Sequence, residues 1–524
     1  TDLARRAVKR SLDRVLPLER SQKQLPGDTA LVFWLDVAGK HMGCVVRRQG
    51  PPVWVVLPGT GKRGRWREED STLPARTLAA LADKTIATAT RLNLVDELKG
   101  QRIAPLLPHL EKMKHLLVVP AGVMSAVPLE ALTDNFTISY VPSASFFARG
   151  MEKHRPLEHA PLLVLDDPDF QRPDSGQPAA PARVLLFKLV LPESLAARAG
   201  LRPGDVLLEY DSRPFARATD LESVADSKEQ VSLKFWRDGI VLRSRIGSGK
   251  LGVIVDERPV NEALAKWRKQ SGELSLLRGD KAWPPLPGTR LEARSLTALV
   301  NKSTLLQGSQ ANEERLAKLA AADELKQFRL LHLATHGEAN ALQPAETALI
   351  LAQNQVPAKP KSGRLTVRTV LKDWELDADL VVLSACQSGL GKATAGDGML
   401  GFTQALLQKG ARSVVLSRWK VDDTATALLM VRFYENLLGR REGLKQPLER
   451  AEALAEAKTW LRTLTRDQAE HHLASLVQGV PRGERGTIKA ALPTRQPEET
   501  KPQQDRPFAH PYYWAAFILL GDPR

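Results

Sequence analysis

Short apolar runs alternate with longer amphipathic segments in the first part of the chain. Up to about residue 170 the apolar runs are DTALVFWLDV, PPVWVVL, HLLVVP, ISYVP and PLLVLDD. One long helix is expected from Leu78 to Leu98, between the second and third runs. Buried strands that alternate with helices are typical of a parallel sheet covered on both faces. This part of the sequence therefore predicts an α/β fold.

The same alternation returns after residue 290. EERLAKLAAADELKQF predicts a helix, and the strands RLLHLATHG and DLVVLSAC follow it. The helix GFTQALLQKG, the strand RSVVLSRWKV and the helix TATALLMVRFYENLL come next, and HPYYWAAFILLGD is a final apolar element. We therefore expect one α/β domain built from both ends of the chain.

A different pattern separates the two α/β segments. Between the proline-rich stretches at 171–183 and 281–290, the chain shows short strands and one short helix. Because exposed loops tolerate insertions, we predict a small domain inserted in a surface loop. The predicted division is 1–25 for an N-terminal helix or linker, 26–180 and 263–524 for the α/β domain, and 181–262 for the insert, with a mobile linker at 479–507.

Composition and charge exclude some classes of function. The 524 residues are 43% hydrophobic and carry a formal net charge of +15, but Lys and Arg are scattered along the chain. The densest basic group, GKRGRWRE at 61–68, lacks the repeated aromatic residues that stack on bases. We interpret it as a solvated loop and do not favour nucleic acid as a partner. No apolar run approaches the ~20 residues needed to span a membrane, so no membrane partner is expected.

The chain contains only two cysteines, Cys44 and Cys386. Two thiols do not make a disulfide framework, so we expect a reduced, cytoplasmic protein. The first residue is Thr1, and we expect the N-terminus to be trimmed from a longer chain.

Two strand ends carry the most reactive side chains. Cys386 follows the strand DLVVLS, and His336 and Gly337 end the strand RLLHLATHG. The carboxyl ends of parallel strands are where open α/β sheets place their sites. If the two strands are neighbours, the His336 imidazole can accept the thiol proton of Cys386. The amides of Gly337 and Cys386 can then bind the oxyanion that forms.

Other interpretations of these residues remain open. A free cysteine is often buried and inert, and a histidine is often structural. His332 and His336 are four residues apart, but a zinc motif with this spacing needs a helix and a glutamate after the first histidine, and here Leu333 follows. We therefore expect no metal and interpret His332 as a buried residue tied to the sheet. The strings PGTGK and GSGK lack the spacing of a P-loop and are interpreted as turns.

Several segments together resemble the CHAT family of caspase-like cysteine peptidases. The resemblance rests on HLATHG, VVLSACQSGLG, GDGMLGF, SVVLSRWKVDDTAT and HPYYWAAFILLGD, with LLVVPAGVMSAVPLEAL and LLVLDDPDF upstream. It covers nearly the whole chain outside the N-terminal segment and the insert. It implies a caspase-like, mostly parallel sheet with helices on both faces, and a Cys/His dyad.

The resemblance also implies roles for single residues near the dyad. Cys386 would be the nucleophile, and His336 the general base that later protonates the leaving amine. Ser384 occupies a position that lines the pocket for the residue before the scissile bond. Trp419 is a candidate wall of a side-chain pocket.

Three acidic residues are candidates for the same pocket. Asp422 and Asp423 follow the strand VVLSRWKV, and Asp397 lies in AGDGM. An acidic pocket would favour cleavage after Arg or Lys. Asp423 could equally cap the following helix at Thr424, so the basic preference remains one of two alternatives.

The insert resembles a PDZ domain, and LAARAGLRPGDVLLEYDSRPF carries the resemblance. PDZ domains bind an extended peptide as an added strand. We predict the binding loop at Leu251, Gly252 and Val253, facing a helix near Asp220–Val224. A purely structural insert with a blocked groove is the alternative.

Together these observations predict a cysteine endopeptidase that cleaves a specific protein substrate and needs no cofactor. The resemblance adds regulation, with a regulatory protein or peptide at the insert groove, and a place in a bacterial defence or cell-death system. The alternative function is a catalytically silent recognition platform for protein partners.

Overall fold

The computed structural model describes most of residues 16–524. The residues outside the described set are 1–15, 38, 151–154, 171–184, 192, 212, 215–229, 238–239, 248, 257, 259–261, 264–282, 284–285, 339–343, 353–362, 385–400, 420, 479–491 and 494–504. Two predicted site residues, Cys386 and Asp397, therefore lie outside the described residues. So do the helix expected near Asp220–Val224 and most of the predicted linker at 479–507.

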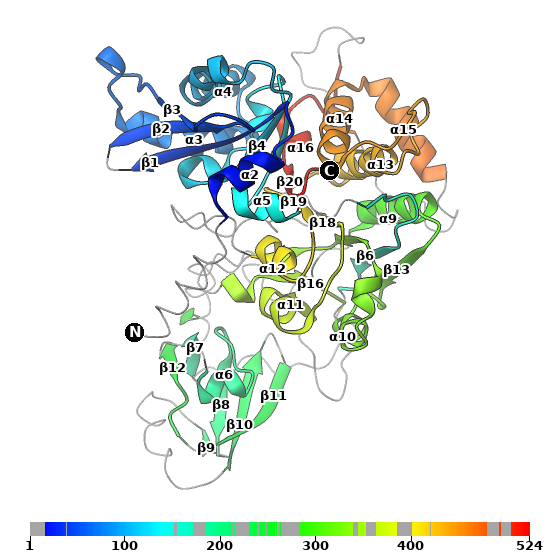
Figure 1. The fold of residues 1–524 in the computed structure, drawn as a ribbon. Coiled ribbons are helices and arrows are strands. Elements are labelled where there is room, and N and C mark those ends of the chain that lie inside the picture. Colours follow the sequence, from blue (N-terminus) through cyan, green and yellow to red (C-terminus); the bar gives the residue numbers. More distant parts are fainter. Residues whose placement is uncertain are drawn as a thin grey trace.

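One large sheet runs through the molecule and joins both ends of the chain (Figure 1). Its eleven strands lie in the order β13 (Ser303–Gly308), β6 (Leu162–Pro168), β14 (Leu330–Ala334), β18 (Leu380–Ser384), β19 (Ser413–Ser417), β20 (Phe517–Gly521), β5 (Thr137–Tyr140), β4 (His115–Val118), β1 (Thr29–Val37), β2 (Lys40–Val46) and β3 (Val53–Val56).

Strand direction divides this sheet into two groups. All neighbours are parallel except β19–β20, β1–β2 and β2–β3. The strands β13, β6, β14, β18 and β19 therefore run one way, and β20, β5, β4 and β1 run the other way. We call the edge where β6, β14, β18 and β19 end the carboxyl edge, and the edge where they begin the amino edge.

Helices cover both faces of the large sheet because its strands alternate apolar residues between two buried clusters. On β14, Leu331 and Leu333 belong to one cluster and Leu330 to the other. The first face carries α3 (Glu68–Ala82), α4 (Thr88–Arg102), α10 (Glu313–Ala321), α11 (Val367–Asp373) and α12 (Phe402–Gln408). The second face carries α9 (Pro287–Leu299), α13 (Asp423–Leu437), α14 (Arg450–Thr463), α15 (Arg466–Gln478) and α16 (Pro511–Trp514), with α2 (Leu18–Gln24) and α5 (Ala144–Gly150) at the N-terminal strands. The predicted mostly parallel α/β sheet is confirmed.

The single long helix expected from Leu78 to Leu98 is wrong, because α3 and α4 are separate. Asp83 ends α3, and its carboxylate accepts hydrogen bonds from the amide and the hydroxyl of Thr85, at 2.9 and 2.7 Å. This local turn interrupts the helix, and α4 then packs against α3.

Two smaller sheets lie outside the large one. Residues 185–256 contribute an antiparallel sheet in the order β11 (Ile240–Gly247), β10 (Gln230–Arg237), β8 (Val206–Tyr210), β7 (Leu185–Val190) and β12 (Val253–Asp256), with β9 (Arg213–Pro214) on β8 and the short helix α6 (Leu195–Arg198). This sheet lies apart from the rest, at the bottom of Figure 1. The second consists of β15 (Gly337–Glu338), β16 (Ala348–Ile350) and β17 (Arg364–Thr366), next to the end of β14.

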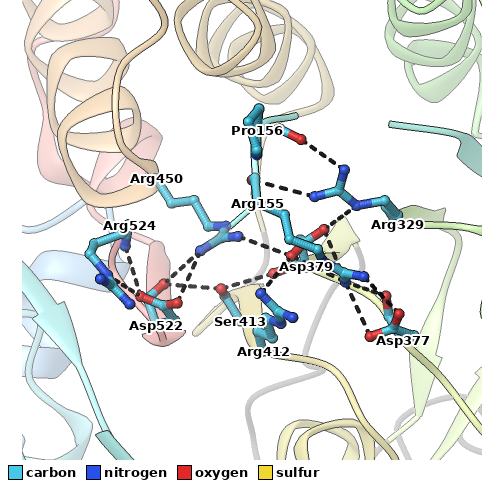
Figure 2. Close-up of polar contacts among 10 residues, drawn as sticks. All are labelled: Arg155, Pro156, Arg329, Asp377, Asp379, Arg412, Ser413, Arg450, Asp522 and Arg524. Carbon is cyan, nitrogen blue, oxygen red and sulfur yellow. Dashed lines mark hydrogen bonds and ion pairs between the residues drawn. The ribbon is translucent and has the colours of Figure 1, made fainter. Parts of the chain in front are cut away.

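Charged side chains join the strands at the amino edge (Figure 2). Asp379, just before β18, is fully buried, and its carboxylate lies 2.5 Å from Nε of Arg329 and 3.2 Å from a guanidinium nitrogen of Arg412. The Ser413 hydroxyl lies 3.0 Å from the main-chain oxygens of both Asp379 and Asp522. These contacts tie the starts of β14, β18 and β19 to the end of antiparallel β20.

Among the described residues, no helix combines the length and the hydropathy needed to cross a membrane.

Candidate active site at the carboxyl edge

The strands β14 and β18, which precede the two predicted catalytic positions, end side by side at the carboxyl edge. They are parallel neighbours, with Ala334 opposite Ser384. In the sequence, His336 and Cys386 each come two residues after this pair. Adjacent strands lie about 4.8 Å apart, so Ala334 and Ser384 lie one strand spacing from each other. Cys386 lies outside the described residues, so its pairing with His336 stays a prediction.

The His336 imidazole packs against two aromatic rings. The Phe170 and Trp283 rings each lie 4.9 Å from it, centroid to centroid. The His336 main-chain oxygen accepts a hydrogen bond from the Ile350 amide at 2.9 Å, and the Thr335 hydroxyl donates to the Ile350 oxygen at 2.5 Å. Side chain and backbone of this half-buried histidine are therefore both positioned by neighbours.

The Gly337 amide points away from the small sheet. Ile350 donates to the oxygen of His336, so these two residues form a hydrogen-bonded antiparallel pair. Pair types alternate along an antiparallel ladder, and Gly337 opposite Leu349 is the next pair. The N–H of Gly337 is thus directed to the side opposite β16, as an oxyanion donor requires.

A buried polar group lies directly beneath this edge. His332 Nε2 is 2.9 Å from Glu292 Oε1, and the Ser384 hydroxyl donates to Glu292 Oε2 at 3.2 Å. The Tyr434 hydroxyl is 3.4 Å from His332 Nδ1, and burial raises the pKa of this phenol well above its usual value, so it stays protonated. Helix α9 is thereby linked to both β14 and β18.

The sequence analysis did not identify Glu292, which contacts the predicted pocket residue Ser384. Ser384 is 6% exposed and its hydroxyl faces Glu292, which is itself 1% exposed. Its predicted role in the substrate pocket stays a prediction. Glu292 is one of several polar residues on α9, and no local pattern in the sequence distinguishes it.

Two adjacent aspartates at the end of β6 were also missed. Burial raises the pKa of Asp166 to about 7, and its carboxylate accepts a hydrogen bond from Gln307 at 2.7 Å. Asp167 lies 2.5 Å from Nε of Arg290 and accepts the Leu286 amide at 2.8 Å. The signal was available, because LLVLDD places both acids at the carboxyl end of a predicted strand.

Trp419 lies just beyond β19 and is part of the core. It is 6% exposed, and its indole N–H donates to the main-chain oxygen of Tyr512 at 3.0 Å. These contacts favour a structural role for its indole, and its predicted place in a pocket wall is untested.

Asp422 and Asp423 have different surroundings. Asp422 is the N-cap of α13 and accepts the Ala425 amide at 3.0 Å, so the cap is Asp422 and not Asp423 as one alternative had it. Asp423 is exposed and packs against Gly288 at the start of α9. A Cβ added to Gly288 would lie 2.5 Å from the Cβ of Asp423. Of the two, Asp423 is the one whose carboxylate is not used as the helix cap.

The predicted peptide-binding residues lie beside an edge strand of the antiparallel sheet. The main-chain oxygen of Leu251 accepts the Ala196 amide at 3.0 Å, and that of Gly252 accepts the Leu191 amide at 2.9 Å. Val253 begins β12, which pairs with β7 and ends the sheet order. An edge strand is where an added peptide strand would pair, but this role is untested.

No group of three or more His, Cys, Asp or Glu side chains that could hold a metal ion occurs among the described residues.

Comparison with known proteins identifies the family. The sequence profile of the CHAT domain matches residues 92–522, a range that includes both strand ends of the candidate site. The chain belongs to the CHAT family. This match begins within α4, includes the strands of the large sheet other than β1, β2 and β3, and shows the predicted family membership.

Individual relatives are more distant than the family profile. Tetratricopeptide repeat protein 28 from Mus musculus is 29% identical over 205 residues, and the protein of that name from Homo sapiens is 29% identical over 273 residues. These matches cover 33% and 46% of this CHAT chain, which spans only 8% of the length of either relative. A probable periplasmic serine endoprotease, DegP-like, from Marinomonas sp. (strain MWYL1) is 31% identical over 98 residues, covering 15% of this chain and 21% of that protein.

The similarity of this chain to solved structures has low TM-scores, as two examples illustrate. The Saccharomyces cerevisiae separase–securin complex matches 97% of this chain and 30% of the other chain, with 10% identity and a TM-score of 0.38. The Arg-specific cysteine proteinase gingipain R matches 87% of this chain and 74% of the other, with 8% identity and a TM-score of 0.32. We draw no functional conclusion from scores this low.

Proposed function

We propose that this CHAT protein is a cysteine endopeptidase of the caspase-like kind, with Cys386 and His336 as its dyad. The observation that carries the proposal is the register of β14 and β18, which sets Ala334 opposite Ser384 two residues before each catalytic position. The packing of the His336 ring against Phe170 and Trp283 supports it, because a general base needs a fixed orientation.

The proposed reaction is acyl transfer to sulfur and then to water. His336 accepts the thiol proton as the Cys386 sulfur bonds to the scissile carbonyl carbon, and the amides of Gly337 and Cys386 bind the resulting oxyanion. His336 then gives the proton to the amine as the C–N bond breaks. Water, deprotonated by His336, hydrolyses the thioester and releases the acid product and the thiol. No cofactor enters this scheme.

A basic residue before the scissile bond is part of the proposal. The support is the exposed side chain of Asp423 beyond the end of β19. Asp397 and Asp422 stay predicted members of this pocket, although the Asp422 carboxylate is engaged in capping α13.

An electrophilic peptide tests the dyad, because it forms an adduct only with a reactive thiolate. Peptidyl acyloxymethyl ketones ending in Arg or in Asp, whose carboxylate group leaves as the thioether forms, are incubated with the full chain at pH 7.5, and the adduct is located by mass spectrometry. We expect labelling at Cys386, faster with the Arg probe, and slowed at least ~10²-fold by His336→Ala.

The second cysteine provides the matched control. Cys44 is 1% exposed, and burial raises its pKa to about 11, so it should stay unlabelled. Cys44→Ala should label at the native rate, and Cys386→Ala should not label. If neither probe modifies Cys386 under any activating condition, the catalytically silent platform for protein partners is the better function.

We infer further that the insert regulates the dyad. Phe170 is the last described residue before the insert, and Trp283 comes after the insert in the sequence. The rings of both residues contact His336. A protein or peptide bound near Leu251, Gly252 and Val253 could therefore alter the His336 position through these two connections.

Trp283→Ala tests this connection. It should slow Cys386 labelling by about tenfold, because an imidazole that loses a packed ring is less well oriented. Trp54→Ala, at a tryptophan that is 46% exposed and distant in sequence, is the control and should label at the native rate. Native labelling of Trp283→Ala would remove the regulatory role. The protein substrate, the cytoplasmic location and a part in bacterial defence remain predictions.

A further inference from the structure

The last strand of the large sheet has an open edge. Among the described strands, β3 pairs with β2 only, and it ends the strand order at the upper left of Figure 1. The Leu57 amide, just after β3, donates to the main-chain oxygen of His41 at 2.9 Å. Hydrogen-bonded and non-hydrogen-bonded positions alternate along an antiparallel ladder, so Trp54 and Val56 are non-hydrogen-bonded positions toward β2. Their main-chain N–H and C=O groups therefore point to the open edge.

One face of the sheet next to this edge is apolar and exposed. Trp54 and Val56 are 46% and 75% exposed, and Leu35 and Val37 on β1 are exposed as well. The register places these side chains on the same face, because Met42 of β2 lies opposite both Leu35 and Val56. An edge strand with exposed apolar side chains is a surface on which a further strand can pair.

A small apolar cavity adjoins this face. Its volume is about 160 Å³, and its walls include Leu18 of α2, Phe147 of α5 and Trp54 of β3. Leu18 and Trp54 are also exposed, so the cavity opens at the surface beside β3. Small-molecule sites have volumes of at least about 300 Å³. The cavity is therefore of a size for one aliphatic side chain of a strand that pairs with β3.

Positive charge surrounds β3 in the sequence. Residues 37–67 contain no Asp or Glu. The loop after β3 returns to the sheet on the face opposite Trp54, because the Trp66 ring stacks on His41 of β2, with centroids 3.6 Å apart. The basic residues of this stretch, all exposed except the half-buried Arg47, are Lys40, Arg47, Arg48, Lys62, Arg63, Arg65 and Arg67.

Few acidic groups offset this charge. Asp36 lies 3.0 Å from a guanidinium nitrogen of the buried Arg102. Asp70 is buried, and its carboxylate accepts the Arg67 amide at 2.7 Å. Glu68 and Glu69 are exposed in the first turn of α3, where the loop ends. The exposed bases of the stretch therefore outnumber the exposed acids next to it.

We propose that β3 binds an extended segment of a partner protein in which apolar residues alternate with Asp or Glu. Edge amides hold an added strand, and alternate side chains select it. The apolar residues lie beside Trp54 and Val56, and the acidic residues lie on the other face, where the loop that contains Trp66 supplies positive charge. A second copy of this chain does not fit, because two basic loops would repel each other. This binding does not depend on the proposed dyad.

Three fluorescent octapeptides test the proposal with the full chain at physiological salt. One alternates Val with Glu, one alternates Val with Lys, and one has its Val and Glu residues in two blocks. Fluorescence anisotropy should show weak, saturable binding of the alternating Val/Glu peptide, because one strand covers a small area. It should bind at least ~10-fold more tightly than the other two. Absence of saturable binding, or equal binding of the block peptide, would overturn the proposal.

N-methylated forms of the Val/Glu peptide test the strand pairing itself. Successive amides of a strand point to opposite edges, so methyl groups on all Val nitrogens or on all Glu nitrogens block one edge only. Because an added strand pairs through one edge, one form should bind at least ~10-fold more weakly and the other should bind like the unmodified peptide. Equal affinities of the two forms would show that no strand is added to β3.

Variants of the chain locate the site. Val56→Pro removes an edge-facing N–H, which an edge strand tolerates, and should weaken Val/Glu peptide binding at least ~10-fold. Arg65→Glu should weaken it about tenfold, whereas Lys372→Glu, the same charge change at an exposed lysine of α11, should change it less than about twofold. Thermal unfolding confirms that each variant folds. Equal effects of the two charge variants would overturn the charge matching. A native dimer that Val56→Pro dissociates in sedimentation would identify a second copy as the occupant instead.

Discussion

The two ends of the same strands carry opposite kinds of chemistry. At the amino edge, the buried carboxylate of Asp379 contacts four guanidinium groups, those of Arg155, Arg329, Arg412 and Arg450. At the carboxyl edge, Glu292, His332 and Asp166 are buried, and burial raises the pKa of Asp166 to about 7. One carboxylate gathers several guanidinium groups at the amino edge, whereas burial disfavours the charge of Asp166 at the carboxyl edge.

This difference follows from strand direction. β20 is antiparallel to β19, so β20 ends at the amino edge, where β19 begins. Ser413 at the start of β19 can therefore donate a hydrogen bond to Asp522, just after β20. The carboxyl edge instead continues into the loops that follow β14 and β18, where open α/β sheets place their sites. The comparison predicts that substitutions at the two edges affect stability in opposite directions.

The largest effect is expected at Asp379. Asp379→Asn leaves four guanidinium groups around an uncharged side chain, so we expect the free energy of unfolding to fall by about 3–5 kcal/mol. Chemical denaturation of both proteins measures this loss, provided that the two unfolding curves have the same m-value.

Asp377 is the matched control for that substitution. It pairs with Arg155, but its side chain is 57% exposed. Asp377→Asn should cost no more than about 1 kcal/mol. A loss of similar size for both variants would mean that burial at the amino edge does not decide the strength of these contacts.

The amino edge also shows where sequence reasoning stops. The strands ending at Ala334 and Ser384 were predicted from apolar runs alone, and their adjacency was a condition that the register of β14 and β18 now meets. The contacts of Asp379 were not predicted, because Arg155 and Arg450 reach it from 224 and 71 positions away. Such pairings depend on tertiary geometry, which leaves no periodic trace in the sequence.

The carboxyl edge gives the second prediction, through Asp166. Burial raises its pKa to about 7, whereas an aspartate in the unfolded chain ionises near 4. Between about pH 4 and pH 7 the folded state therefore binds more protons than the unfolded state, so stability falls as pH rises through this window. Asp166→Asn removes the cost of ionisation. It should be more stable than the native chain at pH 8, by up to about 4 kcal/mol, and equally stable at pH 4.

Thermal unfolding of both proteins from pH 4 to pH 8 measures this difference. If Asp166→Asn is less stable at every pH, the hydrogen bond from Gln307 outweighs the cost of the buried charge. The two edges would then depend on their carboxylates in the same way.

Single residues at the carboxyl edge show a second limit on what the sequence predicts. The run LLVLDD indicated acids at a strand end, but Glu292 gave no such signal, since its partners His332 and Ser384 lie 40 and 92 positions away. The pattern RWKVDD suggested Asp423 as one possible helix cap, and the structure assigns the cap to Asp422 instead. Backbone geometry decides this, because only the residue with extended φ and ψ before the first helical turn can cap, and that residue is Asp422.

The smallest effect is expected for this pair of aspartates. Asp422→Ala removes the hydrogen bond to the Ala425 amide and should cost about 1 kcal/mol of stability. Asp423→Asn should change stability by less than about 0.5 kcal/mol, because its side chain is exposed and is not the cap. If Asp423 lines the proposed pocket, the same variant should lower the preference of Cys386 for the Arg probe over the Asp probe by about tenfold. Labelling rates with both probes, measured beside Asp422→Ala, separate the two roles. A probe preference that Asp423→Asn leaves unchanged would remove Asp423 from the pocket.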